Sequence, residues 1–174
     1  MDQDTVVLTG GDGFFGDTIS LVTEYSGIAS GQVTSRQLPG LVTSRSHHAC
    51  GSYTVAGETV GPSSPYLVVT TLQVLMVTGG FELSSTELIS YPDGQAWREV
   101  ESAALPSPRY GLRGAFLAGV FHVTGGFGCA YVCDEVLAWD PVAESWSQMG
   151  KLEEPVYYHA VAEVPIAAIQ DYCS

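Results

Sequence analysis

The sequence predicts an all-β fold built from three similar units. Three passages end in Thr-Gly-Gly after an apolar residue, and their glycine pairs are Gly10-Gly11, Gly79-Gly80 and Gly125-Gly126. The segments between these passages are short, rich in β-branched and aromatic residues, and bounded by Gly, Pro, Asp or Ser, which is typical of strands. Helical periodicity is missing, and only residues 166–170 could form a single turn.

Each unit continues in the same order after its glycine pair. A strand that ends in an aromatic residue is expected at 19–25, at 86–91 and at 134–139. A tryptophan then follows in the second and third units, whereas the first unit has Val33 near that place. We expect these large apolar rings to fill the space between stacked sheets; they are Tyr91, Trp97, Trp139 and Trp146.

The repeated order divides the chain into units of about 5–56, 72–120 and 121–164. Residues of about 57–71 form an insertion with the turn-rich centre Gly-Pro-Ser-Ser-Pro at 61–65. We expect this insertion to be a protruding loop or an added edge hairpin. The length of 174 residues suits a single domain over 1–174.

Composition and charge exclude several classes of protein. The chain is 45% hydrophobic and 14% charged, which argues against disorder. Its net charge of −13 excludes a nucleic-acid partner, since binding to phosphate backbones needs clustered Lys and Arg. No apolar run approaches the roughly 20 residues of a membrane helix, so no membrane association is expected. The acidic start lacks the features of a secretory signal, which favours the cytoplasm and leaves an extracellular location open.

The glycine pairs and the aromatic residues that follow them resemble kelch repeats. In that family a double glycine is followed by an aromatic residue that closes the next strand, then by a tryptophan, then by an arginine that opens the following blade. The resemblance covers roughly residues 6–164, although the first unit lacks the tryptophan and the third has Tyr157-Tyr158 in place of the arginine. It implies a kelch-type β-propeller of about three four-stranded antiparallel blades around a channel.

In kelch order, this chain would begin on the second strand of a blade at 5–9 and end on a first strand at 158–164. That last strand could pair with the first blade and close the ring. Because propellers typically hold roughly four to eight blades, three do not close a ring alone. The chain is then shortened relative to its relatives, or the insertion supplies strands, or a homodimer completes the ring.

No residue pattern predicts a metal, a cofactor or a catalytic site. His47 and His48 are adjacent, so in a strand they would face opposite ways, and His122 and His159 stand alone. The four cysteines are Cys50, Cys129, Cys133 and Cys173. Cys129 and Cys133 have no partner pair at zinc-finger spacing, and they could pair only across a turn. We expect free thiols in a reducing compartment.

The resemblance implies a non-enzymatic module that binds a protein or peptide. Kelch propellers hold protein segments with loops at one end, and the arginines that open the first strands often point toward the ligand. The matching positions are Arg45 and Arg109, with Arg113 nearby, and a guanidinium group suits an acidic segment. The alternative role of these arginines is a structural salt bridge between blades. Two other functions stay open: a carbohydrate-active or copper-oxidase-like propeller, or a truncated fragment without independent function.

Overall fold

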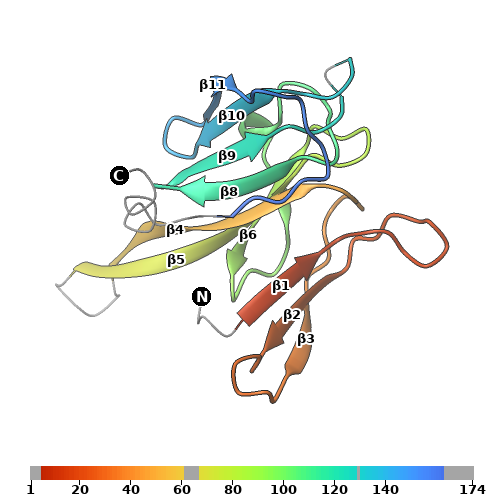
Figure 1. Ribbon diagram of the computed structural model, residues 1–174. Helices are drawn as coiled ribbons and strands as arrows, with labels where there is room; N and C mark the ends of the chain where they lie inside the picture. Colours follow the sequence, from red (N-terminus) through yellow and green to blue (C-terminus); the bar gives the residue numbers. More distant parts are fainter. Residues whose placement is uncertain (1–4, 61–66, 129, 163–174) are drawn as a thin grey trace, which may run out of the picture.

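The computed structural model describes residues 5–60, 67–128 and 130–162 (Figure 1). Its regular elements are antiparallel strands, together with one short 3-10 helix at Glu101–Ala103. The all-β expectation is therefore confirmed for this part of the chain. Within it, no helix has both the length and the apolar character needed to span a membrane.

The strands form three separate sheets, in each of which neighbours along the chain pair with one another. The first sheet contains β1 (Thr5–Thr9), β2 (Val22–Ser26) and β3 (Thr34–Leu38). The second contains β4 (Ala49–Val60), β5 (Leu67–Thr78), β6 (Thr86–Tyr91) and β7 (Arg98–Glu99). The third contains β8 (Arg113–Leu117), β9 (Val120–Thr124), β10 (Glu135–Asp140) and β11 (Ser145–Lys151).

Two layers of apolar side chains hold the sheets together, with the second sheet in the middle (Figure 1). Side chains alternate across β5, so Leu75 and Val77 pack toward the first sheet while Val74 and Met76 pack toward the third. The expected aromatic residues lie in these layers. Trp97 and Tyr91 belong to the layer beside the first sheet, and Trp139 and Trp146 to the layer beside the third.

The insertion lengthens an existing hairpin. Strands β4 and β5 pair without interruption from Ala49 opposite Thr78 to Val60 opposite Leu67. This hairpin extends well beyond the rest of the second sheet (Figure 1). The centre of the insertion, 61–66, lies outside the described residues.

The end of the chain differs from the expectation. Residues 158–162 form no strand, and 163–164 lie outside the described residues, as does the expected turn at 166–170. A strand is stable only where a neighbour completes its hydrogen bonds. Among the described residues no strand pairs with this segment through its backbone, and its contact with β9 is made by the His159 side chain to Thr124. The three sheets do not form a closed ring.

The cysteines also depart from the expectation of free thiols. Cys133 is disulfide-bonded, and its partner lies outside the described residues. Cys50 is a free and exposed thiol. The expectation is therefore wrong for Cys133, because sequence spacing does not show which cysteines a turn brings together.

Candidate binding surface

The three glycine pairs occupy the same backbone geometry. The φ angles are 57° and 120° in the first pair, 71° and 127° in the second, and 58° and 101° in the third. The N–H of each second glycine donates, at 2.8–3.0 Å, to a carbonyl of one of three connecting segments. Segments 39–48 and 100–112 lie between sheets, and 152–162 follows the last sheet. The acceptors are Arg45, Arg109 and Val156, which makes these three positions equivalent. A side chain would be strained at such φ angles, so glycine is needed here.

The connecting segments run side by side through a second repeated contact. The residue two places after each acceptor has a left-handed backbone: φ is 55° at His47, 65° at Gly111 and 55° at Tyr158. The Gly111 N–H donates to the His47 carbonyl at 2.8 Å, and the Tyr158 N–H donates to the Gly111 carbonyl at 2.7 Å. The three segments therefore present their neighbouring side chains to one region.

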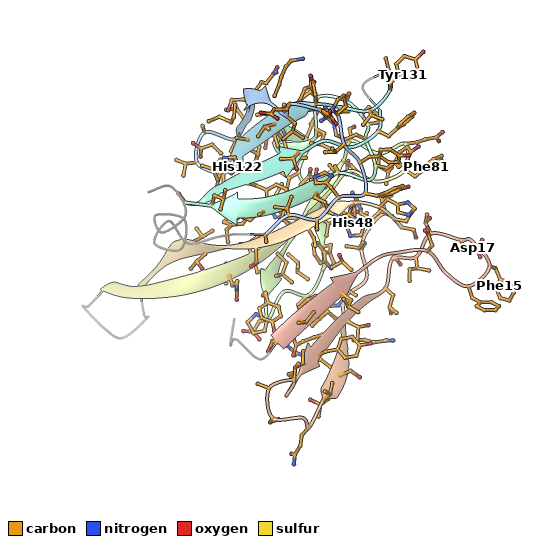
Figure 2. All side chains as sticks on the ribbon, viewed as in Figure 1. Phe15, Asp17, His48, Phe81, His122 and Tyr131 are labelled. Carbon is orange, nitrogen blue, oxygen red and sulfur yellow. The ribbon has the colours of Figure 1, made fainter. Side chains whose placement is uncertain are left out.

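Six rings form a continuous aromatic surface over these segments. They are His47, Phe81, Tyr110, Phe127, Tyr157 and Tyr158, and each lies within 6.4 Å, between ring centroids, of at least one other. Phe81 is 55% exposed, Tyr157 49% and Tyr158 47%. Figure 2 shows Phe81 on the same side of the molecule as Phe15, Asp17 and Tyr131, where the loops after the glycine pairs gather. Contiguous exposed apolar surface of this kind marks interaction sites.

One edge of the aromatic surface is hollowed. Phe81, Tyr110 and Phe127 line a hollow of about 400 Å³ together with Glu82 and Pro108. Tyr110 and Phe127 are joined by two backbone hydrogen bonds, one in each direction, of 3.0 and 2.8 Å. These bonds fix the two backbone positions from which the rings project.

Carboxylates flank the aromatic surface. Asp12, which follows the first glycine pair, places Oδ2 3.3 Å from His47 Nε2. Glu82 is exposed and follows Phe81 directly. Partial burial, together with Tyr110 and the negative charge of Asp12, raises the pKa of Tyr158. The positive charge of Arg113 opposes this shift, so the charged groups beside the aromatic surface are Asp12, Glu82 and Arg113.

Arg45 is buried in a structural ion pair. Its side chain is fully buried, and Nη2 lies 2.6 Å from Oε1 of Glu87, which is fully buried as well. Nη1 donates to the carbonyls of Gly79 and Ser85 at 2.8 and 2.9 Å. Glu87 also accepts the N–H groups of Val42 and Thr43. Arg45 therefore joins a connecting segment to the second sheet and has no free donor edge at the surface.

Arg109 occupies the equivalent place before the third sheet. Its side chain is 2% exposed, and Nη2 lies 2.7 Å from Oε2 of Glu135. Arg113 is half-buried, and its Nη1 donates to the Leu112 carbonyl at 2.8 Å. The contacts of Arg45 and Arg109 support the structural alternative for these residues.

Two histidines repeat one contact between a connecting segment and a strand. His48 Nε2 lies 2.8 Å from Oγ1 of Thr9, and His159 Nε2 lies 2.7 Å from Oγ1 of Thr124. Burial and the nearby positive charge of Arg45 lower the pKa of His48 to about 4. His48 is therefore neutral near pH 7 and serves as a hydrogen-bonding residue. In the described part of the chain, no cluster of His, Cys, Asp and Glu is arranged to hold a metal ion.

Sequence reasoning missed the aromatic surface, although a signal for it was present. Phe81 and Phe127 both stand directly after a glycine pair, and Tyr110 and Tyr157 both stand directly after the carbonyl acceptor of such a pair.

Comparisons with protein-family models and with curated proteins found no match to this sequence.

Proposed function

We propose that the chain is a kelch-type β-propeller module in which the three sheets act as blades. The repeated contacts between connecting segments and sheets support this assignment. The indole N–H of Trp97 donates to the Pro39 carbonyl at 2.8 Å, and that of Trp146 donates to the Ala103 carbonyl at 3.0 Å. Pro39 and Ala103 stand at the same distance before Arg45 and Arg109 in the sequence.

The module binds another protein or peptide without catalysis, and the aromatic surface is its binding face. The single observation that carries this proposal is the set of six rings at one end, formed by residues of the three connecting segments and of the loops that follow the second and third glycine pairs. Aromatic residues are enriched at protein interfaces and at their energetically dominant positions. The acidic partner expected from Arg45 and Arg109 would need exposed guanidinium groups, and these buried side chains do not supply them.

Selection of peptides from a random display library on the immobilised full chain tests the proposal. Peptides that bind should lose at least about tenfold in affinity when Phe81 or Tyr157 is replaced by Ala, the size expected for a central aromatic contact. Phe14→Ala is the matched control, since Phe14 is 97% exposed on the β1–β2 loop and belongs to no part of the aromatic surface. Binding of glycans on an array, or of stoichiometric copper, in place of peptides would overturn the proposal in favour of a carbohydrate-active or oxidase-like propeller.

The first sheet has a face that no other sheet of the described residues covers, and this face suggests how the module assembles. Val6 and Leu8 on β1 are 47% and 55% exposed. The residues at the same distance before the second glycine pair, Leu75 and Val77, are 5% and 0% exposed because a preceding sheet covers them. We propose that a second copy of this chain covers β1 and so completes the ring.

Light scattering tests this assembly. Wild-type protein should show the mass of a dimer, and replacement of both Val6 and Leu8 by Ser should yield a folded monomer. A monodisperse wild-type monomer would rule out the dimer, and an aggregated or unfolded sample would favour a fragment without independent function.

The disulfide at Cys133 favours the extracellular alternative over the cytoplasm, since disulfides persist in oxidising compartments.

A further inference from the structure

We infer that the hollow beside Phe81 binds a cation, namely an arginine or lysine side chain of the protein partner. This inference rests on the proposed protein-binding function and adds the chemical class that the surface selects. Three rings line the hollow: the Phe81 and Tyr110 centroids lie 5.2 Å apart, and those of Tyr110 and Phe127 lie 5.4 Å apart. The rings are tilted by 48° and 40° to one another, so they are not stacked face to face.

Aromatic faces carry partial negative charge and attract guanidinium and ammonium groups. The hollow adds a full negative charge, because the exposed Glu82 lies in its lining. Glu82 belongs to none of the ion pairs that the described part of the chain forms. Its carboxylate is therefore available to a cation held against the rings.

The one cation in the lining does not oppose this charge. Arg109 is 2% exposed, and its Nη2 lies 2.7 Å from Oε2 of Glu135. Its positive charge is therefore balanced inside the fold. The chain as a whole carries a net charge of −13, which further favours approach of a basic segment.

The backbone holds the hollow in place before any ligand arrives. The Gly80 N–H donates to the Arg109 carbonyl at 3.0 Å, which positions Phe81 beside Tyr110. Glu82 has a left-handed backbone with φ of 59°, an uncommon conformation for a residue with a side chain. The Leu83 N–H closes this turn onto the Gly80 carbonyl at 3.0 Å. Such strained positions cluster at ligand-binding sites, and here the strain projects a carboxylate beside the rings.

The test is an NMR titration of the full chain with two short peptides. One is acetyl-Gly-Arg-Gly-amide, and the other carries citrulline, a neutral residue of the same shape, in place of arginine. The arginine peptide should shift the amide signals of Phe81, Tyr110 and Phe127, and the citrulline peptide should bind at least about fivefold more weakly, as expected for loss of a cation–π contact.

Three variants separate the sources of binding. Phe81→Leu keeps apolar bulk but removes the ring, and it should weaken the arginine peptide by about two- to fivefold, while Glu82→Gln should weaken it by about threefold. Phe14→Leu, which changes an exposed ring elsewhere, should leave it unchanged. Because Phe81 and Glu82 are exposed, all three variants should fold, and a thermal melt checks this.

The inference is overturned if the citrulline peptide binds as well as the arginine peptide, if Phe81→Leu has no effect, or if the amide shifts spread over acidic residues outside the hollow. The proposed function is judged separately. If library-selected peptides still depend on Phe81 and Tyr157 while the arginine peptide fails, the binding face stands and its preference for cations is rejected. If both fail, the binding face is rejected as well.

Discussion

Replacing Arg45 by Met should destabilise the fold far more than replacing any exposed cation. Arg45 and Glu87 are both fully buried and lie 2.6 Å apart. The substitution removes the guanidinium group but leaves the Glu87 carboxylate without its counter-charge in the interior. An unpaired buried charge is costly because it has lost both water and its partner.

The structure sets the expected size of the loss. Arg45 also donates to the carbonyls of Gly79 and Ser85 and to the hydroxyl of Ser85, so several acceptors lose their donor together. Breaking one side of a buried ion pair costs about 3–5 kcal/mol. In a domain of this size each kcal/mol lowers Tm by roughly 2–4 °C, which gives a decrease of about 10 °C. The two N–H groups of Val42 and Thr43 still bind Glu87 and keep the loss from being larger.

Urea unfolding followed by circular dichroism measures the free energy of unfolding. Arg36→Met is the matched control, because Arg36 also pairs with a glutamate at 2.6 Å but its side chain is 53% exposed. Its cost should be smaller, because Glu24, whose side chain is 11% exposed, keeps the Tyr91 hydroxyl as a donor at 2.8 Å. The double variant Arg45→Met with Glu87→Gln should recover about 1–3 kcal/mol, since it removes the stranded charge. If Arg45→Met costs no more than Arg36→Met, the structural role is wrong and Arg45 is again a candidate for ligand binding.

Three further outcomes are expected. His48 is neutral in the folded chain down to about pH 4, whereas in the unfolded chain it takes up a proton below about pH 6.5. The free energy of unfolding should therefore fall by up to about 3 kcal/mol as pH drops from 6.5 to 4, and His48→Gln should remove this part of the pH dependence in urea titrations. Gly125→Ala should lower Tm much more than Gly119→Ala: both have positive φ, but a Cβ at Gly125 would collide with a backbone carbonyl, while at Gly119 it meets nothing within 4 Å; equal losses would contradict the packing argument. Iodoacetamide should label Cys50 in the untreated protein and the buried Cys133 only after reduction and unfolding, as peptide mass spectrometry can show.

The repeated order of residues predicted the number of sheets, because each strand is a local pattern bounded by turn residues. Strand β6 has the predicted limits of 86–91, and β10 begins one residue later than predicted, at Glu135. Strand β2 begins three residues later than expected, at Val22. Before it, the Ile19 carbonyl accepts from Arg45 and the Ser20 carbonyl from Leu41, so connecting segments take up these backbone groups in place of a strand.

The candidate site was harder to predict because its residues have few local partners. An arginine at a loop position has the same sequence signature whether it faces a ligand or a buried glutamate. Glu87 lies far along the chain from Arg45, and nothing in the intervening sequence links the two. The aromatic surface has the same difficulty, since contacts such as that between His47 and Tyr158, 5.0 Å apart, arise only when the connecting segments run side by side.

The connecting segments alternate between buried and exposed side chains at neighbouring positions. In the second segment Arg109 and Leu112 are buried, while Tyr110 between them joins the aromatic surface. In the third, His159 bonds a strand while Tyr157 and Tyr158 stand half-exposed. Because the buried residues and the backbone hydrogen bonds hold each segment, the exposed rings can change without loss of the fold. Substitutions at these rings should therefore leave the sheets intact.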